Sequence, residues 1–330
     1  MCVKVFEEHF KRDLVEIEEK IKNCSENGEV LNQLKKDKEY ILGCLYPELK
    51  KPVKKADFDL ELVDTKEEMS NLIINNQVYL YPIQNFCFTN KNDKKLEDLF
   101  DSFIEEDTFG LKKIYEEIIS DNRLVYVKKS DNFLGCNTFI PSVNKNYIEI
   151  KESKKLYETS TKIHELGHAQ TNLEKYNDAI VKKNNSFLES YPVFLELVFA
   201  DYLKKNGKTK QGFELKFLIF QKMRDLTKIL YDELCEYKKH GEEKRGLKYF
   251  FEYNYKTVKG INLSLYLYYL YKENPQEALK FISSFIRMVK FFDDKQIIKK
   301  FNLNKDCFNS DNVYKLHREL KIEKNNIKSR

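Results

Sequence analysis

The chain has 330 residues, 42% of them hydrophobic and 34% charged, so it has enough apolar side chains for the core of one large domain or two smaller ones. Its 58 Lys and Arg residues exceed its 53 Asp and Glu residues by five, a surplus too small and too scattered to indicate a nucleic-acid partner. The seven cysteines form no C-x-x-C pair, which argues against a disulfide framework or a zinc ribbon. The first residues are partly acidic where a signal peptide requires an apolar stretch, and no apolar run is long enough to span a bilayer. We therefore expect a cytoplasmic protein without membrane contact.

Helices are expected to dominate, because the chain has only 10 Gly and 6 Pro residues to interrupt them. Apolar residues recur at helical spacing in the segments 5–21, 31–45, 96–119, 187–203, 213–237 and 263–288. Short alternating or β-branched runs predict strands at 58–63, 78–81, 124–128, 137–140 and 147–150. The last three strands come directly before a histidine-containing segment and predict a small antiparallel sheet beside it. The expected fold class is mostly α with this small sheet.

One turn signal, Ser120-Asp121-Asn122, divides the chain. We expect an N-terminal helical region at 1–120 and a second region at 121–330, which contains the residues able to carry chemistry. No internal repeat and no Pro-, Gly- or Ser-rich linker marks a further boundary.

The segment TKIHELGHAQ, at 161–170, contains the pattern H-E-x-x-H. On a helix, residues four apart project from one face, so the imidazoles of His164 and His168 can bind the same ion. Zinc suits this pair because it accepts neutral imidazole nitrogens. In this pattern Glu165 is the general base that activates a water molecule. The pattern also arises by chance on amphipathic helices, but two of the five histidines in the chain fall within it.

A catalytic zinc ion requires a third protein ligand, and the segment 186–203 supplies two acidic candidates. Glu189 and Glu196 are seven residues apart, two turns along one helix face, within an otherwise apolar segment. Burial of an unpartnered carboxylate is costly, so both acids require a partner. We assign Glu189 as the ligand and Glu196 as an acceptor that orients a ligand imidazole. If Glu189 points away from the histidines, Glu196 is the next candidate ligand.

Two segments together resemble the zinc oligopeptidases, the family that includes oligoendopeptidase F and thimet oligopeptidase. They are HELGHA at 164–169 and FLESYPVFLE at 187–196, the second of which matches the family's ligand glutamate followed by another glutamate seven residues later. Upstream, the segments 135–137 and 147–150 are similar to a glycine-containing strand and to the strand that enters the zinc helix. The resemblance covers roughly the stretch from Leu134 to Leu279.

The resemblance implies a zincin-like helical metallopeptidase that binds one Zn²⁺ ion and hydrolyses short peptides. By position, His164, His168 and Glu189 would be the zinc ligands and Glu165 the general base. The strand at 135–140 would pair with the backbone of a peptide held in a deep channel.

A tyrosine-rich segment, KYFFEYNYKTVKG at 248–260, is similar to the family segment in which a Tyr hydroxyl donates a hydrogen bond to the oxyanion. A phenol is a neutral donor that can stabilise negative charge developing opposite the metal. Tyr253 occupies the best-matching position for this role. Tyr255 is the competing choice, and it is otherwise expected to contact the substrate. His240 matches the family's histidine ahead of this segment and is also expected to contact the substrate.

The chain departs from the family in length and in several tyrosine positions. It is far shorter than typical members, the separation between His168 and Glu189 is tighter, and Phe250 and Gly246 stand where the family has tyrosines. Two alternatives therefore stay open beside a peptidase of short peptides. One is a selective protease of a single protein target, and the other is a scaffold protein that keeps the fold with an idle metal site.

Four remaining features have a structural interpretation. His9 and His317 lie on predicted helices without a second metal-binding residue at a useful spacing, so we expect ordinary helix positions for both. The tyrosines at 266–271 lack interleaved basic residues, which favours packing in the core over stacking on bases. Cys136 is expected to be a small buried hydrophobic residue, because no base is placed beside it in the sequence.

Overall fold

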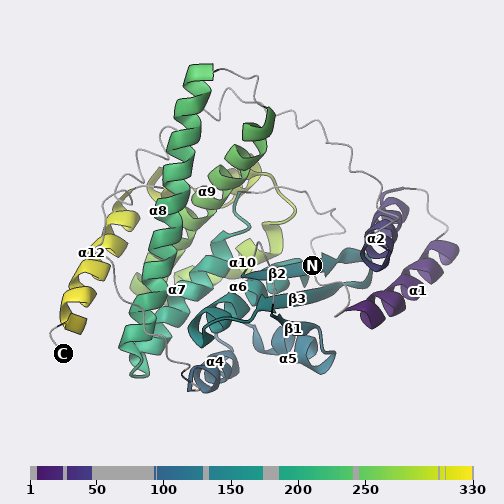
Figure 1. Cartoon of the computed structure of the whole chain (residues 1–330), viewed down its shortest axis with the longest axis horizontal. Coiled ribbons are helices and arrows are strands. Elements are labelled where there is room, and N and C mark those ends of the chain that lie inside the picture. The colour runs from purple at the N-terminus through teal and green to yellow at the C-terminus, as the bar shows by residue number, and fades with distance from the viewer. Residues whose placement is uncertain are drawn as a thin grey trace.

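Helices form most of the structure, and a small three-stranded sheet lies among them (Figure 1). This computed structural model describes residues 6–24, 28–46, 93, 95–128, 134–173, 186–240, 245–303, 305–308 and 310–328. The strands expected at 58–63 and 78–81 lie outside the described residues. The described part has the mostly α architecture with a small sheet that the sequence predicts.

The elements follow one another in three groups along the chain. The helices before the sheet are α1 Glu7–Asn23, α2 Glu29–Leu45, α4 Lys95–Glu105 and α5 Lys112–Ser120. The sheet region consists of β1 Leu124–Val127, β2 Gly135–Ile140, the 3-10 turn η4 Pro141–Val143 and β3 Lys145–Lys151. The helices after the sheet are α6 Lys155–Leu173, α7 Ser190–Lys205, α8 Thr209–His240, α9 Arg245–Glu273, α10 Pro275–Met288, α11 Asp294–Lys300, the 3-10 helix η6 Lys305–Phe308 and α12 Ser310–Lys328.

Two segments expected as single helices are each divided by a break. Between α4 and α5, Asp107 and Gly110 adopt positive φ angles of 48° and 70°, a conformation that cannot continue an α-helix. Between α9 and α10, the side chain of Asn274 accepts a hydrogen bond from the backbone N–H of Glu277 and caps α10. Pro275 comes next and begins α10, because a proline has no N–H to donate and fits only the first turn of a helix.

The sheet has the strand order β1-β3-β2 and is mixed rather than purely antiparallel. Strands β2 and β3 pair antiparallel, as expected, because η4 and Asn144, with a φ of 54°, reverse the chain between them. Strand β1 pairs parallel with the opposite edge of β3. Strand β2 is consequently an edge of the sheet, and it lies next to α6.

The two faces of the sheet are covered by different helices. On one face, the side-chain amide of Asn137 donates to Glu165 O over 3.1 Å and that of Asn146 donates to Ala169 O over 3.3 Å, which ties β2 and β3 to α6. On the other face, the ring of Tyr147 packs against Phe6 and Phe10 of the α1–α2 hairpin, with centroid separations of 5.1 and 5.0 Å. One face of the sheet therefore contacts α6, and the opposite face contacts the α1–α2 hairpin.

Buried aspartates attach the α1–α2 hairpin to the sheet. Asp13 is 1% exposed, accepts a hydrogen bond from the hydroxyl of Tyr147 and lies 2.6 Å from the Nζ atom of Lys145. Asp37 accepts hydrogen bonds from the backbone N–H and the hydroxyl of Ser142, over 2.8 and 2.5 Å. These bonds satisfy the buried carboxylates and fix the hairpin against the turn after β2.

The main hydrophobic core surrounds α7, which contacts α6, α8 and α9. Eleven of the sixteen residues of α7 are buried, and between Ser190 and Ala200 only Glu196 is not, so this stretch of the helix packs on nearly all sides, as a central helix must. Helices α4 and α5 also pack against α6 and share this core, whereas α1 and α2 form a smaller core with the sheet. Among the described helices, none combines the length and apolar character that crossing a bilayer requires.

A charged cluster around one buried lysine ties the C-terminal helices to α7. Lys216 of α8 is 0% exposed, and its Nζ atom lies 2.7 Å from Asp201 Oδ1 and 2.5 Å from the hydroxyl oxygen of Tyr268. The same hydroxyl donates to Asp201 Oδ2 over 2.6 Å. Glu319 of α12 lies 3.4 Å from the lysine, so a single buried cation joins α7, α8, α9 and α12.

Candidate metal centre

The paired histidines lie side by side on α6. The segment 161–170 is helical, and the ring centroids of His164 and His168 are 4.9 Å apart. Ile163 and Leu166 are both 0% exposed and fix the opposite face of the helix in the core. The four-residue spacing therefore places both imidazoles on the face that is turned towards α7.

A glycine within the motif allows α6 and α7 to approach closely. A Cβ atom at Gly167 would lie 2.9 Å from Pro192 Cα and 3.1 Å from Leu195 Cδ1. Gly260 of α9 plays a similar part at the start of α7, because a Cβ atom there would lie 2.6 Å from Ser186 O. These two contacts set the position of the turn from which Glu189 projects towards the histidines.

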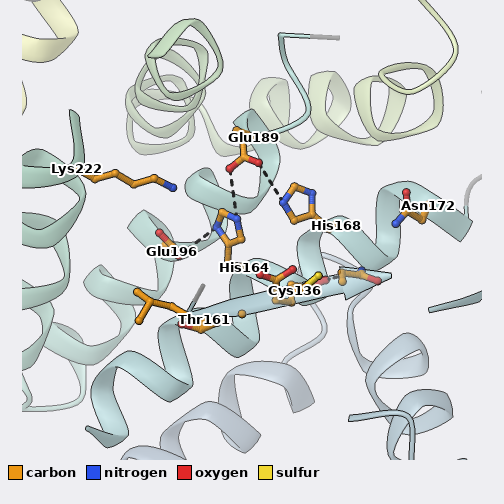
Figure 2. A pocket seen from close by; sticks show the side chains of 12 residues that line it. Cys136, Thr161, His164, His168, Asn172, Glu189, Glu196 and Lys222 are labelled. Atoms are coloured by element: carbon orange, nitrogen blue, oxygen red, sulfur yellow. Dashed lines mark hydrogen bonds and ion pairs between the residues drawn. The ribbon is translucent and has the colours of Figure 1, made fainter. Parts of the chain in front are cut away.

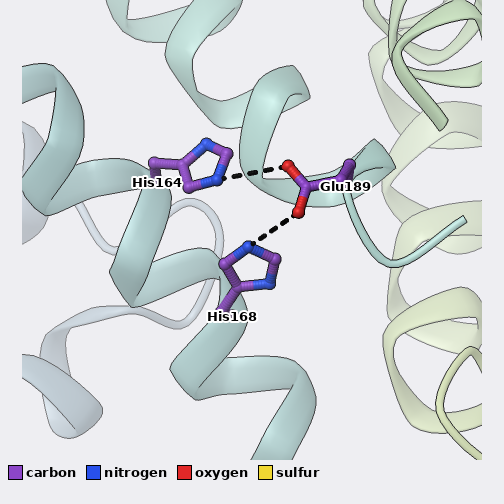
Figure 3. A group of neighbouring side chains, drawn as sticks. All are labelled: His164, His168 and Glu189. Atoms are coloured by element: carbon purple, nitrogen blue, oxygen red, sulfur yellow. Dashed lines mark ion pairs between the residues drawn. The ribbon is translucent and has the colours of Figure 1, made fainter. Parts of the chain in front are cut away.

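Glu189 bridges the two imidazoles (Figure 3). Its Oε2 atom lies 3.4 Å from His164 Nε2, and its Oε1 atom lies 3.5 Å from His168 Nε2. One ligand atom from each of the three residues can be chosen so that all lie within 4.8 Å of one another. In the described part of the chain, these three residues form the single group with metal-ligand spacing.

The chemistry of the three side chains fits a zinc ion. Two imidazole nitrogens and one carboxylate are the ligand set of a catalytic zinc site with an open fourth position. Burial lowers the pKa of His164, but the carboxylates of Glu196 and Glu189 outweigh this effect and raise the pKa to about 10. Burial raises the pKa of Glu189, but contacts with both imidazoles hold it well below its usual range. The centre of the group thus favours positive charge, which a divalent cation would provide.

Glu196 contacts the same imidazole from its other side. Its Oε1 atom lies 3.2 Å from His164 Nδ1, whereas Glu189 faces Nε2 of that ring. Glu189 and Glu196 therefore both reach His164, and Glu196 does not belong to the three-residue group. A carboxylate on Nδ1 fixes the orientation of an imidazole whose Nε2 is available to a metal.

Glu165 lies in the cavity beside the histidines and is 6% exposed. Burial is the main reason why its pKa is raised above the usual value for a glutamate. Gly135 of β2 leaves the space that this side chain occupies, because a Cβ atom there would lie 2.2 Å from Thr161 Cγ2 and 2.9 Å from Glu165 Oε1. The edge strand can therefore lie directly against the face of α6 that carries Glu165.

These residues line one cavity of about 540 Å³ (Figure 2). Its lining residues are Leu134, Gly135, Cys136, Asn137, Thr161, His164, Glu165, His168, Asn172, Glu189, Glu196 and Lys222. Sequence reasoning gave no role to Asn137 or Lys222. Asn137 is a partly buried polar side chain on the face of β2 that contacts α6, and Lys222 lies on a long charged helix where no local pattern distinguishes it.

Other residues expected at the site are not brought to it by the described structure. The side chains of His240 and Tyr253 lie outside the described part, so their roles stay predictions. Tyr255 is 6% exposed and packs in the main core, where its ring lies 5.6 Å from Lys259 Nζ, and it does not line the cavity.

The remaining histidines and Cys136 have other surroundings. His9 lies on α1, with its Nδ1 atom 2.6 Å from the guanidinium of Arg12. His317 stacks on Phe220 with a centroid separation of 5.6 Å, and burial lowers its pKa. Cys136 lines the cavity, but burial raises the pKa of its thiol, so the unreactive neutral form is favoured.

No known family profile matches the sequence, and no curated protein matches it in a sequence comparison. Solved structures match the fold. A protein assigned as oligoendopeptidase F from Bacillus anthracis str. Ames has a TM-score of 0.56 and 13% identity over 88% of this chain. PZ peptidase A, solved with an inhibitor, has a TM-score of 0.57 and 13% identity over 96% of this chain. A further structure assigned as oligoendopeptidase F has a TM-score of 0.55 and 11% identity over 78% of this chain.

The chain is shorter than each of these proteins. It spans 63% and 55% of the two proteins assigned as oligoendopeptidase F, and 66% of PZ peptidase A. At 11–13% identity the likeness concerns the fold. The chain thus shares the mostly helical architecture, with its small sheet, of oligopeptidase-like structures.

Proposed function

We propose that the chain is a zinc-dependent metallopeptidase that hydrolyses short peptides. The observation that carries the proposal is the convergence of His164, His168 and Glu189 in a cavity that Glu165 also lines. The fold it shares with structures assigned as oligoendopeptidase F supports the same reaction class. Under this proposal the three converging residues hold one zinc ion.

The chain's own residues supply the proton transfers of the reaction. Bound zinc would polarise the peptide carbonyl and lower the pKa of a water molecule. Glu165 accepts the proton of the attacking water as the new C–O bond forms, and the carbonyl oxygen then carries the negative charge. The same carboxyl group next donates that proton to the amide nitrogen, so that the peptide C–N bond breaks and the amine leaves. Its neighbours in the cavity, Gly135 and Thr161, keep the carboxyl group beside the histidines. Glu196 orients the ring of His164 through Nδ1.

The edge strand and the tyrosine segment position the substrate in this proposal. Strand β2 lines the cavity and has β3 on one side only, so its other edge can pair with an extended peptide backbone. Tyr253 donates a hydrogen bond to the oxyanion, as the tyrosine-rich segment predicts. Peptides of different sequence would then be held in the same way, because the strand contacts only their backbone.

Metal analysis combined with one substitution tests the proposal. The purified protein should bind one zinc ion per chain and cleave a mixed library of short peptides, and a chelator should stop cleavage until zinc is restored. The Glu165→Gln variant should keep the zinc and lose cleavage by at least about 100-fold. Glu152→Gln is the matched control, because Glu152 is an exposed acid just before α6. This variant should cleave peptides at the parent rate.

The outcomes separate the proposal from its alternatives. Cleavage by Glu165→Gln at the parent rate would show that another residue is the base. Inactivity on every peptide combined with cleavage of one protein would indicate a selective protease. Zinc binding without any cleavage would indicate a scaffold that has kept its metal site.

A further inference from the structure

Lys222 of α8 reaches the cavity from the side of Glu196. Helices α7 and α8 are joined by a short turn and run antiparallel, and Gly212 packs against Ala200 O at their contact. Lys222 lies about three helical turns from Gly212, and Glu189 lies about three turns from Ala200 in the matching direction, so the two residues are at the same level. In Figure 2 the amino group of Lys222 points into the cavity, towards the metal-binding group. The side chain is also exposed, so a ligand can reach it from solvent.

Lys222 differs in charge from the acidic residues that line the cavity. Among the described lining residues it is the single lysine or arginine, and the acidic ones are Glu165, Glu189 and Glu196. An anionic ligand group is repelled by these carboxylates, so outside the metal-binding group the ammonium of Lys222 is where such a group is stabilised. Carboxylates bind ammonium groups through short charge-assisted hydrogen bonds.

The direction of β2 indicates which end of a peptide meets Lys222. Gly135, the first residue of β2, lies against Thr161, and Figure 2 places Thr161 on the same side of His164 as Lys222. The strand then runs towards Asn172 at the other end of the cavity. Antiparallel pairing is slightly more stable per residue than parallel pairing. A peptide that pairs antiparallel with β2 therefore has its C-terminal half on the Lys222 side.

We propose that Lys222 binds a carboxylate of the peptide on the C-terminal side of the scissile bond. This inference rests on the proposed peptidase function and adds a preference to it. The antiparallel direction makes the free C-terminal carboxylate the expected group, and a glutamate side chain in the C-terminal half is the other source of the same chemistry. Peptides cleaved close to their C-terminus would then be the preferred substrates.

The test measures binding and cleavage separately. Binding is followed by fluorescence anisotropy with zinc-loaded Glu165→Gln protein, which holds the peptide without turnover. The probes share one N-terminally labelled sequence and differ in charge: a free C-terminal acid, its C-terminal amide, and amides that carry either Glu or Gln in the C-terminal half. Cleavage of the same peptides by the parent protein judges the peptidase proposal.

Lys222→Met, which removes the charge and keeps the length, should weaken binding of the free acid about tenfold and leave the amide unchanged. Lys222→Arg should restore most of the preference, and Lys228→Met, at an exposed lysine on α8 away from the cavity, should change nothing. If the Glu-containing amide shows the lysine-dependent gain instead of the free acid, the C-terminal assignment is overturned.

Equal affinities for all four peptides, or an equal loss for all four in Lys222→Met, would overturn the role of Lys222 even if the parent cleaves them. Charge-selective binding without cleavage by the parent would instead overturn the peptidase proposal and support the carboxylate site.

Discussion

His164 and Glu196 meet on the side of the imidazole that faces away from Glu189, with 3.2 Å between Nδ1 and Oε1. The two ring nitrogens of His164 therefore face different carboxylates, one at each end of the ring. Such an arrangement fixes the rotation of the imidazole, and the carboxylate on Nδ1 would keep a proton there when Nε2 binds a metal. Glu196 lies in the second turn of α7, and Glu189 is the residue directly before this helix, so the position of one helix sets both contacts.

Removal of the Glu196 carboxylate should weaken zinc binding while leaving the ligands in place. We expect Glu196→Ala to lower zinc affinity about 10- to 100-fold, because the ring of His164 loses its orienting acceptor. Glu196→Gln should lose less, since an amide oxygen still accepts from Nδ1. Competition with a chromogenic chelator measures both affinities, with Glu152→Ala as the control. Unchanged affinity in Glu196→Ala would show that the contact does not orient the ligand.

Zinc should stabilise the folded protein through the same group. A ligand that binds only the folded state at 100 times its Kd adds about 2.7 kcal/mol to the free energy of unfolding. Urea denaturation with zinc and after chelation should show a difference of this size in the parent. His168→Ala should show little dependence on zinc, because one of the three converging ligands is missing. If the free energy of unfolding of the parent protein is the same with and without zinc, the assignment of the metal site is wrong.

Gly135 should be required for the close approach of β2 to α6. In Gly135→Ala the new Cβ atom would meet Thr161 Cγ2 at 2.2 Å and Glu165 Oε1 at 2.9 Å, so strand and helix must move apart. Overpacking of this kind costs about 1–3 kcal/mol, and displacement of Glu165 should lower peptide cleavage as well. The double variant Gly135→Ala/Thr161→Ser, which removes the methyl group, should recover part of the stability. Urea denaturation compares the variants, and no loss in Gly135→Ala would show that the contact relaxes freely.

Much of the metal centre could be predicted because its spacing is a property of a single helix. His164 and His168 are four residues apart, and helix geometry alone places them on one face. The contact with Glu189 is different, because this residue lies in the turn before α7 and its position depends on packing at Gly167 and Gly260. The sequence could nominate Glu189, but only the tertiary packing determines that it faces both rings.

Other features depend on topology or on local backbone and were missed or wrong. Hydrophobic periodicity predicts β1 as a strand, yet it does not show that β1 pairs parallel with β3, because the direction of pairing depends on topology. The break between α4 and α5 rests on two positive φ angles, at Asp107 and Gly110, inside an apolar pattern that reads as one helix. Lys222 reaches the cavity only through the antiparallel contact of α7 and α8, which no local pattern reveals.

The ion pair between the buried Lys216 and the partly buried Asp201 should make stability depend on acid pH. Burial raises the pKa of Asp201, but the charge of Lys216 outweighs this effect and holds the pKa at about 2. Because this value lies below the unfolded-state pKa of about 3.9, the stabilisation is fully present above about pH 4 and is lost as the pH falls through about 2. The linked contribution is about 2–3 kcal/mol.

Asp201→Asn should lower the free energy of unfolding at neutral pH by about 3 kcal/mol, because it leaves the charge of a fully buried lysine undercompensated. The stability of this variant should also change less between about pH 4 and pH 2 than that of the parent. The double variant Asp201→Asn/Lys216→Met should be more stable than Asp201→Asn alone, since the buried cation is gone. Asp232→Asn, at an exposed acid on α8, is the control for urea denaturation across this pH series. If Asp201→Asn and Asp232→Asn have the same pH profile, the ion pair does not contribute to the acid sensitivity of the fold.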